Sequence, residues 1–304
     1  MYRLTYSRIA VPVLVKNPGE LVVSASYVQA ERLSGREKKL LVGLHGNPGS
    51  SKQYKQILSE FIRRDYTTVV PDFPGFGDTD NCLGEYGLST DGRANFLRSF
   101  LDQKGFSQPG LLLSFSSASF AAVGALLNSS KPPAACLFVS PNGFRSAVNL
   151  RPLWLMKSIA RLDSRLVYTV YSKLIGLSLP SDIFSSTARV AAAWDYEEYR
   201  EKVRNLREKL QNIPILVVYG SKDNLIENSA AREFASTLGV EKSTNSFLSC
   251  GPEEGSSMLE TIYRINQKFG TNKFCIELKN AGHTLLKEEP SLVADLCCVA
   301  GQFV

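Results

Sequence analysis

The sequence Leu-Leu-Val-Gly-Leu-His-Gly-Asn-Pro-Gly-Ser at residues 40–50 joins a short apolar run to a turn rich in glycine and proline. The run Leu40–Leu44 predicts a buried strand, and the turn follows it at His45. Two later segments repeat this arrangement: Thr67–Val70 followed by Pro-Asp-Phe-Pro-Gly-Phe-Gly at 71–77, and Leu111–Leu113 followed by Ser-Phe-Ser-Ser-Ala at 114–118. Ligands of open α/β sheets bind beyond the carboxyl ends of strands, so these loops are candidate sites.

Helical patterns separate these strands and continue beyond them. Residues 54–64 carry apolar side chains three and four positions apart, which is the spacing of a helix face. Further predicted helices are Ala94–Gln103, Ala118–Leu127, Ala230–Leu238, Met258–Phe269 and Pro290–Val299, and further strands are Leu137–Val139, Ile215–Tyr219 and Phe274–Leu278. Continuous apolar strands that alternate with helices indicate an α/β protein whose mostly parallel sheet is covered on both faces. The polar stretch 241–255 has no assigned role.

Two segments depart from this pattern, one at the N-terminus and one between residues 144 and 212. Ile9–Val15 and Leu21–Val28 are rich in β-branched residues and flank the turn Asn17-Pro18-Gly19, so we expect an N-terminal antiparallel hairpin. Between residues 144 and 212 the strand pattern stops. Helix-like segments replace it, at Leu153–Leu162, Arg165–Ile175 and Tyr196–Leu210. We therefore expect a core domain of residues 1–143 and 213–304 with a helical cap, residues 144–212, inserted late in the chain.

Composition excludes several classes of protein. The chain has 304 residues, of which 44% are hydrophobic and 21% charged, so it is neither disordered nor a coiled coil. The formal net charge of +6 comes without blocks of like charge, and we expect no nucleic-acid partner. The N-terminus lacks the features of a secretory signal, which favours a cytoplasmic protein and leaves room for a short organellar presequence. Six cysteines without a CxxC pair, and only two histidines, predict free thiols and no metal site. We also expect no cofactor.

The loops together resemble those of the α/β-hydrolase superfamily. His-Gly-x-Pro-Gly at 45–49 and Asp-x-Pro-Gly-Phe-Gly at 72–77 are similar to motifs of its capped branch, which holds epoxide hydrolases, haloalkane dehalogenases and proline iminopeptidases. The resemblance covers about residues 38–144 and 213–302. It implies an α/β-hydrolase fold with a helical cap, and it places a nucleophile in the loop at 114–118.

Ser116 is the nucleophile that this resemblance implies. The family's turn reads G-x-S-x-G, because the positions two before and two after the nucleophile must be small. Here they are Ser114 and Ala118, the smallest replacements for glycine, so we expect the turn to form. Dehalogenases and epoxide hydrolases place Asp at this position, whereas serine favours acyl transfer. A serine-rich helix start without chemistry is the alternative.

The resemblance also implies the partners of Ser116. A serine hydroxyl needs a base and an orienting acid. His283 is the base, since the family uses His45 structurally, and Asp223, in Gly-Ser-Lys-Asp after strand Ile215–Tyr219, is the acid. The order Ser, Asp, His along the chain is that of the family. The backbone N–H groups of Asn47 and Ser117 would form the oxyanion hole.

These residues predict a serine hydrolase that cleaves a small or medium acyl ester, or a related acyl compound, through an acyl-enzyme. Two alternatives stay open. One is a catalytically silent binding protein of the same fold, which the altered S-x-S-x-A turn motivates. The other is a peptidase resembling proline iminopeptidases. The sequence determines neither the physiological substrate nor the oligomeric state.

The cap segment carries most of the positive charge of the chain. Residues 144–212 contain twelve Lys or Arg and seven Asp or Glu, together with two tryptophans. One interpretation is an apolar-lined lid with a basic outer surface that makes weak contact with anionic membrane. The other is an ordinary solvated cap whose aromatic residues pack on the core.

Overall fold

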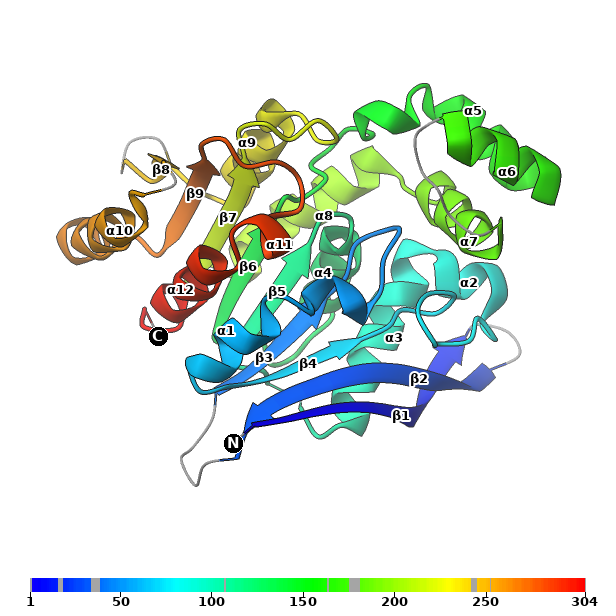
Figure 1. Ribbon diagram of the computed structural model, residues 1–304, viewed down its shortest axis with the longest axis horizontal. Helices are drawn as coiled ribbons and strands as arrows, with labels where there is room; N and C mark the ends of the chain where they lie inside the picture. Colours follow the sequence, from blue (N-terminus) through cyan, green and yellow to red (C-terminus); the bar gives the residue numbers. More distant parts are fainter. Residues whose placement is uncertain are drawn as a thin grey trace.

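A nine-stranded sheet forms the centre of the protein in a computed structural model (Figure 1). The structure describes residues 2–15, 19–33, 39–106, 108–162, 164–174, 181–241, 245–251 and 253–303. The strand order is β1-β2-β4-β3-β5-β6-β7-β9-β8. The strands are β1 Tyr2–Val15, β2 Gly19–Arg32, β3 Lys39–Leu44, β4 Tyr66–Pro71, β5 Leu111–Phe115, β6 Ala135–Val139, β7 Ile215–Gly220, β8 Phe247–Cys250 and β9 Lys273–Leu278.

The pairing of the strands confirms the predicted sheet. β2 pairs antiparallel with β1 and with β4, and every other neighbouring pair is parallel. The strands β5, β6 and β7 are buried along their whole length, as expected of central parallel strands. Their carboxyl ends therefore meet at one edge of the sheet. Asn17 and Pro18 of the predicted hairpin turn lie outside the described residues.

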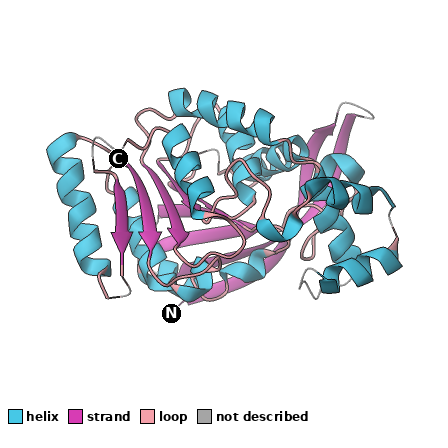
Figure 2. Cartoon of the chain, turned by 90° about the horizontal axis from the view of Figure 1, so that it is seen from above, coloured by secondary structure: helices cyan, strands magenta, loops and turns pink. Residues whose placement is uncertain are grey.

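Helices cover both faces of the sheet, which Figure 2 shows from above. One apolar cluster lies under α3, α4, α8 and α9, and a second lies under α1, α11 and α12. The helices outside the β6–β7 connection are η1 Ser51–Tyr54, α1 Leu58–Arg63, α2 Gly84–Leu88, α3 Thr90–Gln103, α4 Ala118–Leu127, α9 Asn228–Thr237, α10 Gly255–Phe269, α11 Leu285–Glu288 and α12 Pro290–Ala300. No helix in the described ranges is both long and apolar enough to cross a bilayer.

The long connection between β6 and β7 is helical, as predicted. It contains η2 Val148–Leu150, α5 Leu153–Leu162, α6 Arg165–Leu174, α7 Ser181–Ala192 and α8 Tyr196–Lys209. Phe120 of α4 stacks on both Trp194 and Tyr199, with ring centroids 5.2 and 4.0 Å apart. These helices thus share one apolar cluster with the sheet. The division into a core domain and a cap stays a prediction; we call η2 to α8 the insertion.

Several elements differ from the expected bounds. β1 and β2 extend well beyond the predicted hairpin, because their outer ends pair through the backbone without an apolar pattern. Ser114 and Phe115, expected in a loop, belong to β5. The segment 241–255, read as irregular, contains the edge strand β8. Ile175, the last residue of a predicted helix, lies outside the described residues.

Candidate active site

The turn between β5 and α4 consists of only two residues, Ser116 and Ser117. Ser116 has a φ of 55°, the left-handed region that non-glycine residues rarely adopt. Its N–H donates to the carbonyl of Val139 at 2.8 Å. Gly46 approaches so closely that a Cβ there would lie 3.1 Å from the Cβ of Ser116. The expected tight turn therefore forms with Ser114 and Ala118 at its flanking positions.

Three side chains from distant parts of the sequence meet at this turn. The Nε2 atom of His283 lies 2.9 Å from the Oγ of Ser116, and its Nδ1 lies 2.7 Å from Oδ2 of Asp223. Ser116 follows β5, Asp223 follows β7 and His283 follows β9, at the carboxyl ends of parallel strands. The chain thus brings the predicted nucleophile, base and acid into one hydrogen-bonded row. In this row, His283 can accept the proton of Ser116 while Asp223 holds the opposite ring nitrogen.

Asp223 is held rigidly in this row. Its side chain is only 2% exposed. While Oδ2 faces His283, Oδ1 accepts hydrogen bonds from the N–H groups of Leu225 at 2.8 Å and Ile226 at 2.9 Å. Both carboxylate oxygens are therefore used. This arrangement is suited to an ionised acid that orients an imidazole.

Two further residues brace the loop that carries His283. The hydroxyl of Ser140 donates to the His283 carbonyl at 3.0 Å. Glu288 of α11 accepts from the N–H of Gly282 at 2.5 Å, and from the N–H and hydroxyl of Thr284 at 3.0 and 2.7 Å. One carboxylate therefore fixes the residues on both sides of the base. Burial alone would raise the pKa of Glu288, but these hydrogen bonds outweigh it and lower the pKa.

Replacing Glu288 by glutamine is expected to loosen the loop that carries His283. Any turnover that depends on His283 should then show a kcat about tenfold lower, with little change in KM. The depressed pKa means that the Glu288 carboxylate stabilises the fold fully above about pH 4.5, its ordinary pKa, and progressively less as pH falls below it. The Tm difference between wild type and variant should therefore shrink on acidification. Steady-state kinetics test the expected loss of turnover, and thermal melts between about pH 3 and 8 test the Tm difference. Glu289→Gln serves as the control for both measurements. A Tm difference that does not vary with pH would contradict the carboxylate's role.

The predicted oxyanion donors also lie side by side. The N–H of Asn47 donates to the Oγ of Ser117 at 2.8 Å, so the two residues are adjacent as expected. However, the hydroxyl of Ser117 occupies the Asn47 N–H, which the sequence analysis did not foresee. The Asn47 side chain in turn donates through Nδ2 to the carbonyl of Thr187 in α7 at 3.1 Å. The loop after β3 thus contacts both the helix α4 and the insertion.

His45 is not available as a base. It is fully buried; its Nδ1 donates to the carbonyl of Gly46 at 2.8 Å, and its Nε2 accepts from the N–H of Phe73 at 2.9 Å. Burial, followed by the nearby Arg93 cation, lowers the pKa of His45 to about 4. Arg93 is itself buried, with its guanidinium 4.0 Å above the Phe73 ring. His45 is therefore a neutral structural residue, as the resemblance implied.

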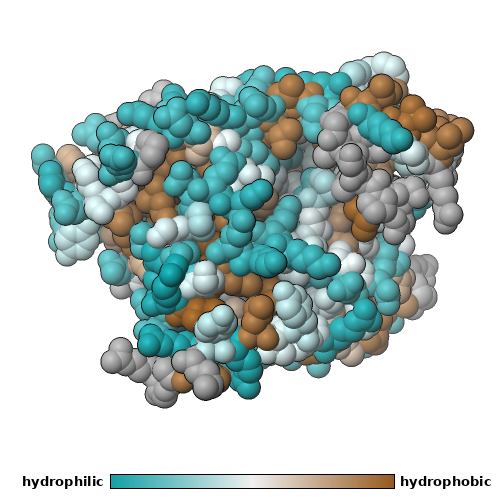
Figure 3. Space-filling view, viewed as in Figure 1, coloured by the Kyte–Doolittle hydropathy of each residue, from teal (hydrophilic) through white to brown (hydrophobic). Residues whose placement is uncertain are grey.

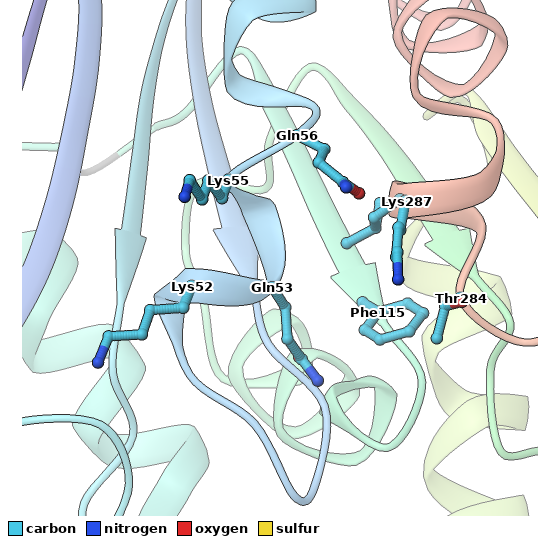
Figure 4. A pocket seen from close by; sticks show the side chains of 8 residues that line it. Lys52, Gln53, Lys55, Gln56, Phe115, Thr284 and Lys287 are labelled. Atoms are coloured by element: carbon cyan, nitrogen blue, oxygen red, sulfur yellow. The ribbon is translucent and has the colours of Figure 1, made fainter.

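A pocket of about 260 Å³ opens next to the row of Ser116, Asp223 and His283 (Figure 4). Phe115 and Thr284, the neighbours of Ser116 and His283, form part of its wall. The side chains of Gln53 and Lys287 point toward this space in Figure 4, so the wall also carries polar groups. The other lining residues are Lys52, Lys55, Gln56 and Leu286. Among the described residues, no group of three His, Cys, Asp or Glu side chains is placed to hold a metal.

Sequence reasoning missed the roles of Glu288, Ser140 and the Ser117 hydroxyl. All three contact backbone groups of the loops that carry Asn47 and His283. Such contacts depend on the path of the backbone. The sequence signal for Glu288 is its position five residues after His283, and it becomes meaningful only once α11 is placed.

The sheet order, the strand-to-helix turn at Ser116 and the row Ser116–His283–Asp223 together define the α/β-hydrolase fold. The chain belongs to the family described as "Alpha/beta hydrolase of unknown function (DUF1057)", whose model matches residues 8–300. No curated protein matches the sequence. The family match and the geometry thus agree on an α/β-hydrolase fold.

Solved structures with low sequence identity share this fold. Haloalkane dehalogenase DbeA from Bradyrhizobium elkani USDA94 is 15% identical, with a TM-score of 0.63 over 99% of both chains. A thermophilic esterase from Thermogutta terrifontis is also 15% identical, with a TM-score of 0.63 over 95% of this chain and 96% of that one. Carboxylesterase CesB from Bacillus subtilis is 15% identical, with a TM-score of 0.57 over 96% and 90% of the two chains.

Proposed function

We propose that the protein is a serine hydrolase that cleaves a small or medium acyl ester through a Ser116–His283–Asp223 triad. The observation that carries this proposal is the position of His283, 2.9 Å from the Ser116 hydroxyl and 2.7 Å from the Asp223 carboxylate. The esterase and carboxylesterase among the similar structures support the fold in which such a triad works. The insertion would serve as the cap over this site.

In the proposed reaction, Ser116 Oγ attacks the acyl carbon while His283 Nε2 takes its proton. The carbonyl oxygen becomes an oxyanion, which accepts hydrogen bonds from the N–H groups of Ser117 and Asn47. The C–O bond then breaks, and the leaving alkoxide takes the proton from His283. Water, deprotonated by His283, attacks the acyl-enzyme in the same way and releases the acid and free Ser116.

Labelling with a fluorophosphonate probe tests this proposal. The probe should modify wild type at Ser116, because only an activated serine attacks phosphorus at a useful rate. Ser116→Ala should remain unlabelled, whereas Ser114→Ala, two residues earlier in β5, should label normally. Absence of labelling in folded wild type would favour the silent binding protein.

The peptidase alternative is separated by substrate. Proline iminopeptidases would also react with the fluorophosphonate probe, since they use a serine. Release of an N-terminal proline from a chromogenic amide, at a rate exceeding that of p-nitrophenyl ester hydrolysis, would favour that alternative. We expect the ester to be the better substrate.

The Ser117 hydroxyl gives a further prediction. Because it occupies the Asn47 N–H, a substrate oxygen must displace it to reach that donor. Ser117→Ala should therefore raise kcat/KM for p-nitrophenyl esters about fivefold, the value of one net hydrogen bond of about 1 kcal/mol. Ser119→Ala, two residues later in α4, serves as control. A decrease on Ser117→Ala would mean that the hydroxyl itself donates to the oxyanion.

A further inference from the structure

The outer surface of α5 and α6 is apolar. Five large hydrophobic side chains of these two helices are between 52 and 77% exposed: Trp154, Leu162, Leu166, Val170 and Leu174. Figure 3 shows hydrophobic residues gathered at this corner of the molecule, where Figure 1 places α5 and α6. Isolated exposed hydrophobic residues are ordinary on soluble proteins, but contiguous patches mark interaction surfaces. We call these five residues the outer patch.

The outer patch is not the face by which these helices are held to the protein. Met156, Ile159 and Ala160 of α5, and Tyr168 of α6, are buried in the apolar cluster that includes the sheet. Tyr168 packs against Phe184 of α7 with ring centroids 5.5 Å apart. Each helix therefore has an inner apolar face that is satisfied within the chain and an outer apolar face that is exposed to solvent.

The positive charge of α5 and α6 indicates which kind of partner the outer patch would contact. Lys157, Arg161 and Lys173 lie on α5 and α6, and neither helix contains an Asp or Glu. None of these three cations is within ion-pairing distance of a carboxylate in the described ranges. The neighbouring α8 differs, because its Lys202 and Arg204 pair with acidic side chains at 2.8 and 2.9 Å. An apolar surface with an exposed tryptophan and unopposed cations is typical of helices that lie on anionic lipid.

We propose that the outer patch docks the protein on anionic lipid bilayers, with α5 and α6 lying in the plane of the membrane surface. The five apolar side chains enter the boundary between headgroups and acyl chains, and the cations contact lipid phosphates. Resting on the proposed function, this docking makes acyl compounds dissolved in such membranes the substrate class. The insertion also contacts the candidate active site, because the Thr187 carbonyl of α7 accepts a hydrogen bond from Nδ2 of Asn47.

Vesicle binding tests the docking independently of catalysis. Ser116→Ala protein is mixed with vesicles of phosphatidylcholine alone, or of phosphatidylcholine with phosphatidylserine, and the bound fraction is measured by flotation. We expect binding to the anionic vesicles that weakens as salt rises. Leu166→Gln with Leu174→Gln should lower the partition coefficient about tenfold or more, since each loses an inserted apolar side chain. Arg161→Gln with Lys173→Gln should abolish the preference for phosphatidylserine.

Matched variants outside the outer patch control for general effects. Leu14→Gln removes a leucine of β1 that is 73% exposed, and Arg264→Gln with Lys268→Gln removes two cations of α10. None of these should change vesicle binding. In a Trp194→Phe background, the fluorescence of Trp154 should shift to the blue and be quenched by brominated lipid.

Three results would overturn the docking proposal. They are no binding to anionic vesicles, binding that the Leu166 and Leu174 substitutions leave unchanged, and a dimer in sedimentation velocity that those substitutions dissociate. The last would assign the outer patch to a second copy of this chain. Turnover of a water-soluble p-nitrophenyl ester should persist in every outer-patch variant that retains Ser116. If wild type does not hydrolyse that ester, the hydrolase proposal is rejected, whereas the docking proposal is still decided by the vesicle binding.

Discussion

Replacing Ser116 by alanine is expected to lower kcat for p-nitrophenyl ester hydrolysis by about 10⁵- to 10⁶-fold. Without the hydroxyl no acyl-enzyme can form, and His283 has nothing to deprotonate except water. The residual rate should come from the oxyanion donors and from substrate binding, which alone give about 10³- to 10⁴-fold over water. Pre-steady-state kinetics with substrate in excess should also lose the initial burst of p-nitrophenol.

The control for this loss is chosen from the same strand. Ser114→Ala removes a buried hydroxyl that has no hydrogen-bond partner among the described residues, two positions before Ser116. Its kcat should stay within a few-fold of wild type, and its circular dichroism should be unchanged. Turnover by Ser116→Ala at more than a hundredth of the wild-type rate would show that another residue is the nucleophile.

Asparagine at position 223 is expected to lower kcat about 10⁴-fold while the fold is retained. The Asp223 carboxylate only accepts hydrogen bonds, from His283 Nδ1 and from two backbone N–H groups. An amide keeps a single acceptor oxygen. If that oxygen stays with Leu225 and Ile226, the NH₂ group faces His283 and favours the tautomer whose Nε2 carries the proton. That tautomer cannot deprotonate Ser116.

Steady-state kinetics and fluorophosphonate labelling rates measure this effect. Both should fall together, since both need an activated Ser116. Lys222→Ala, next to Asp223 in the chain and exposed, should leave both unchanged. A loss smaller than tenfold in Asp223→Asn would mean that Asp223 positions its loop and that a different group orients His283.

The sheet could be predicted from the sequence because strand burial is visible there as a pattern of apolar residues. Central strands such as Ile215–Gly220 are buried on both faces, so they read as unbroken apolar runs. The helix α7 was missed because its buried residues, apart from Phe184, are small: Thr187, Ala188, Val190 and Ala191. Small side chains give little periodic contrast. The edge strand β8 is four residues long and half-exposed, so it lacks an apolar run.

The candidate site was predictable to a different extent. Ser116, Asp223 and His283 follow three strands, and parallel strands bring such positions to one edge of a sheet. Their roles came from resemblance to a known family, and the structure places them in contact. Ser140 and Glu288 could not be found in this way. Each acts on a backbone group near His283, and the contact arises from how the loops pass each other.

The hydrogen bond between Asn47 and Thr187 couples two parts of the protein that could otherwise move separately. A displacement of α7 large enough to admit a bulky acyl group would break this hydrogen bond and release the side chain of Asn47. Under the proposed function, the admission of substrate and the position of the Asn47 loop would then be thermodynamically linked. Substitutions along α7 would then change turnover without ever meeting the reacting atoms.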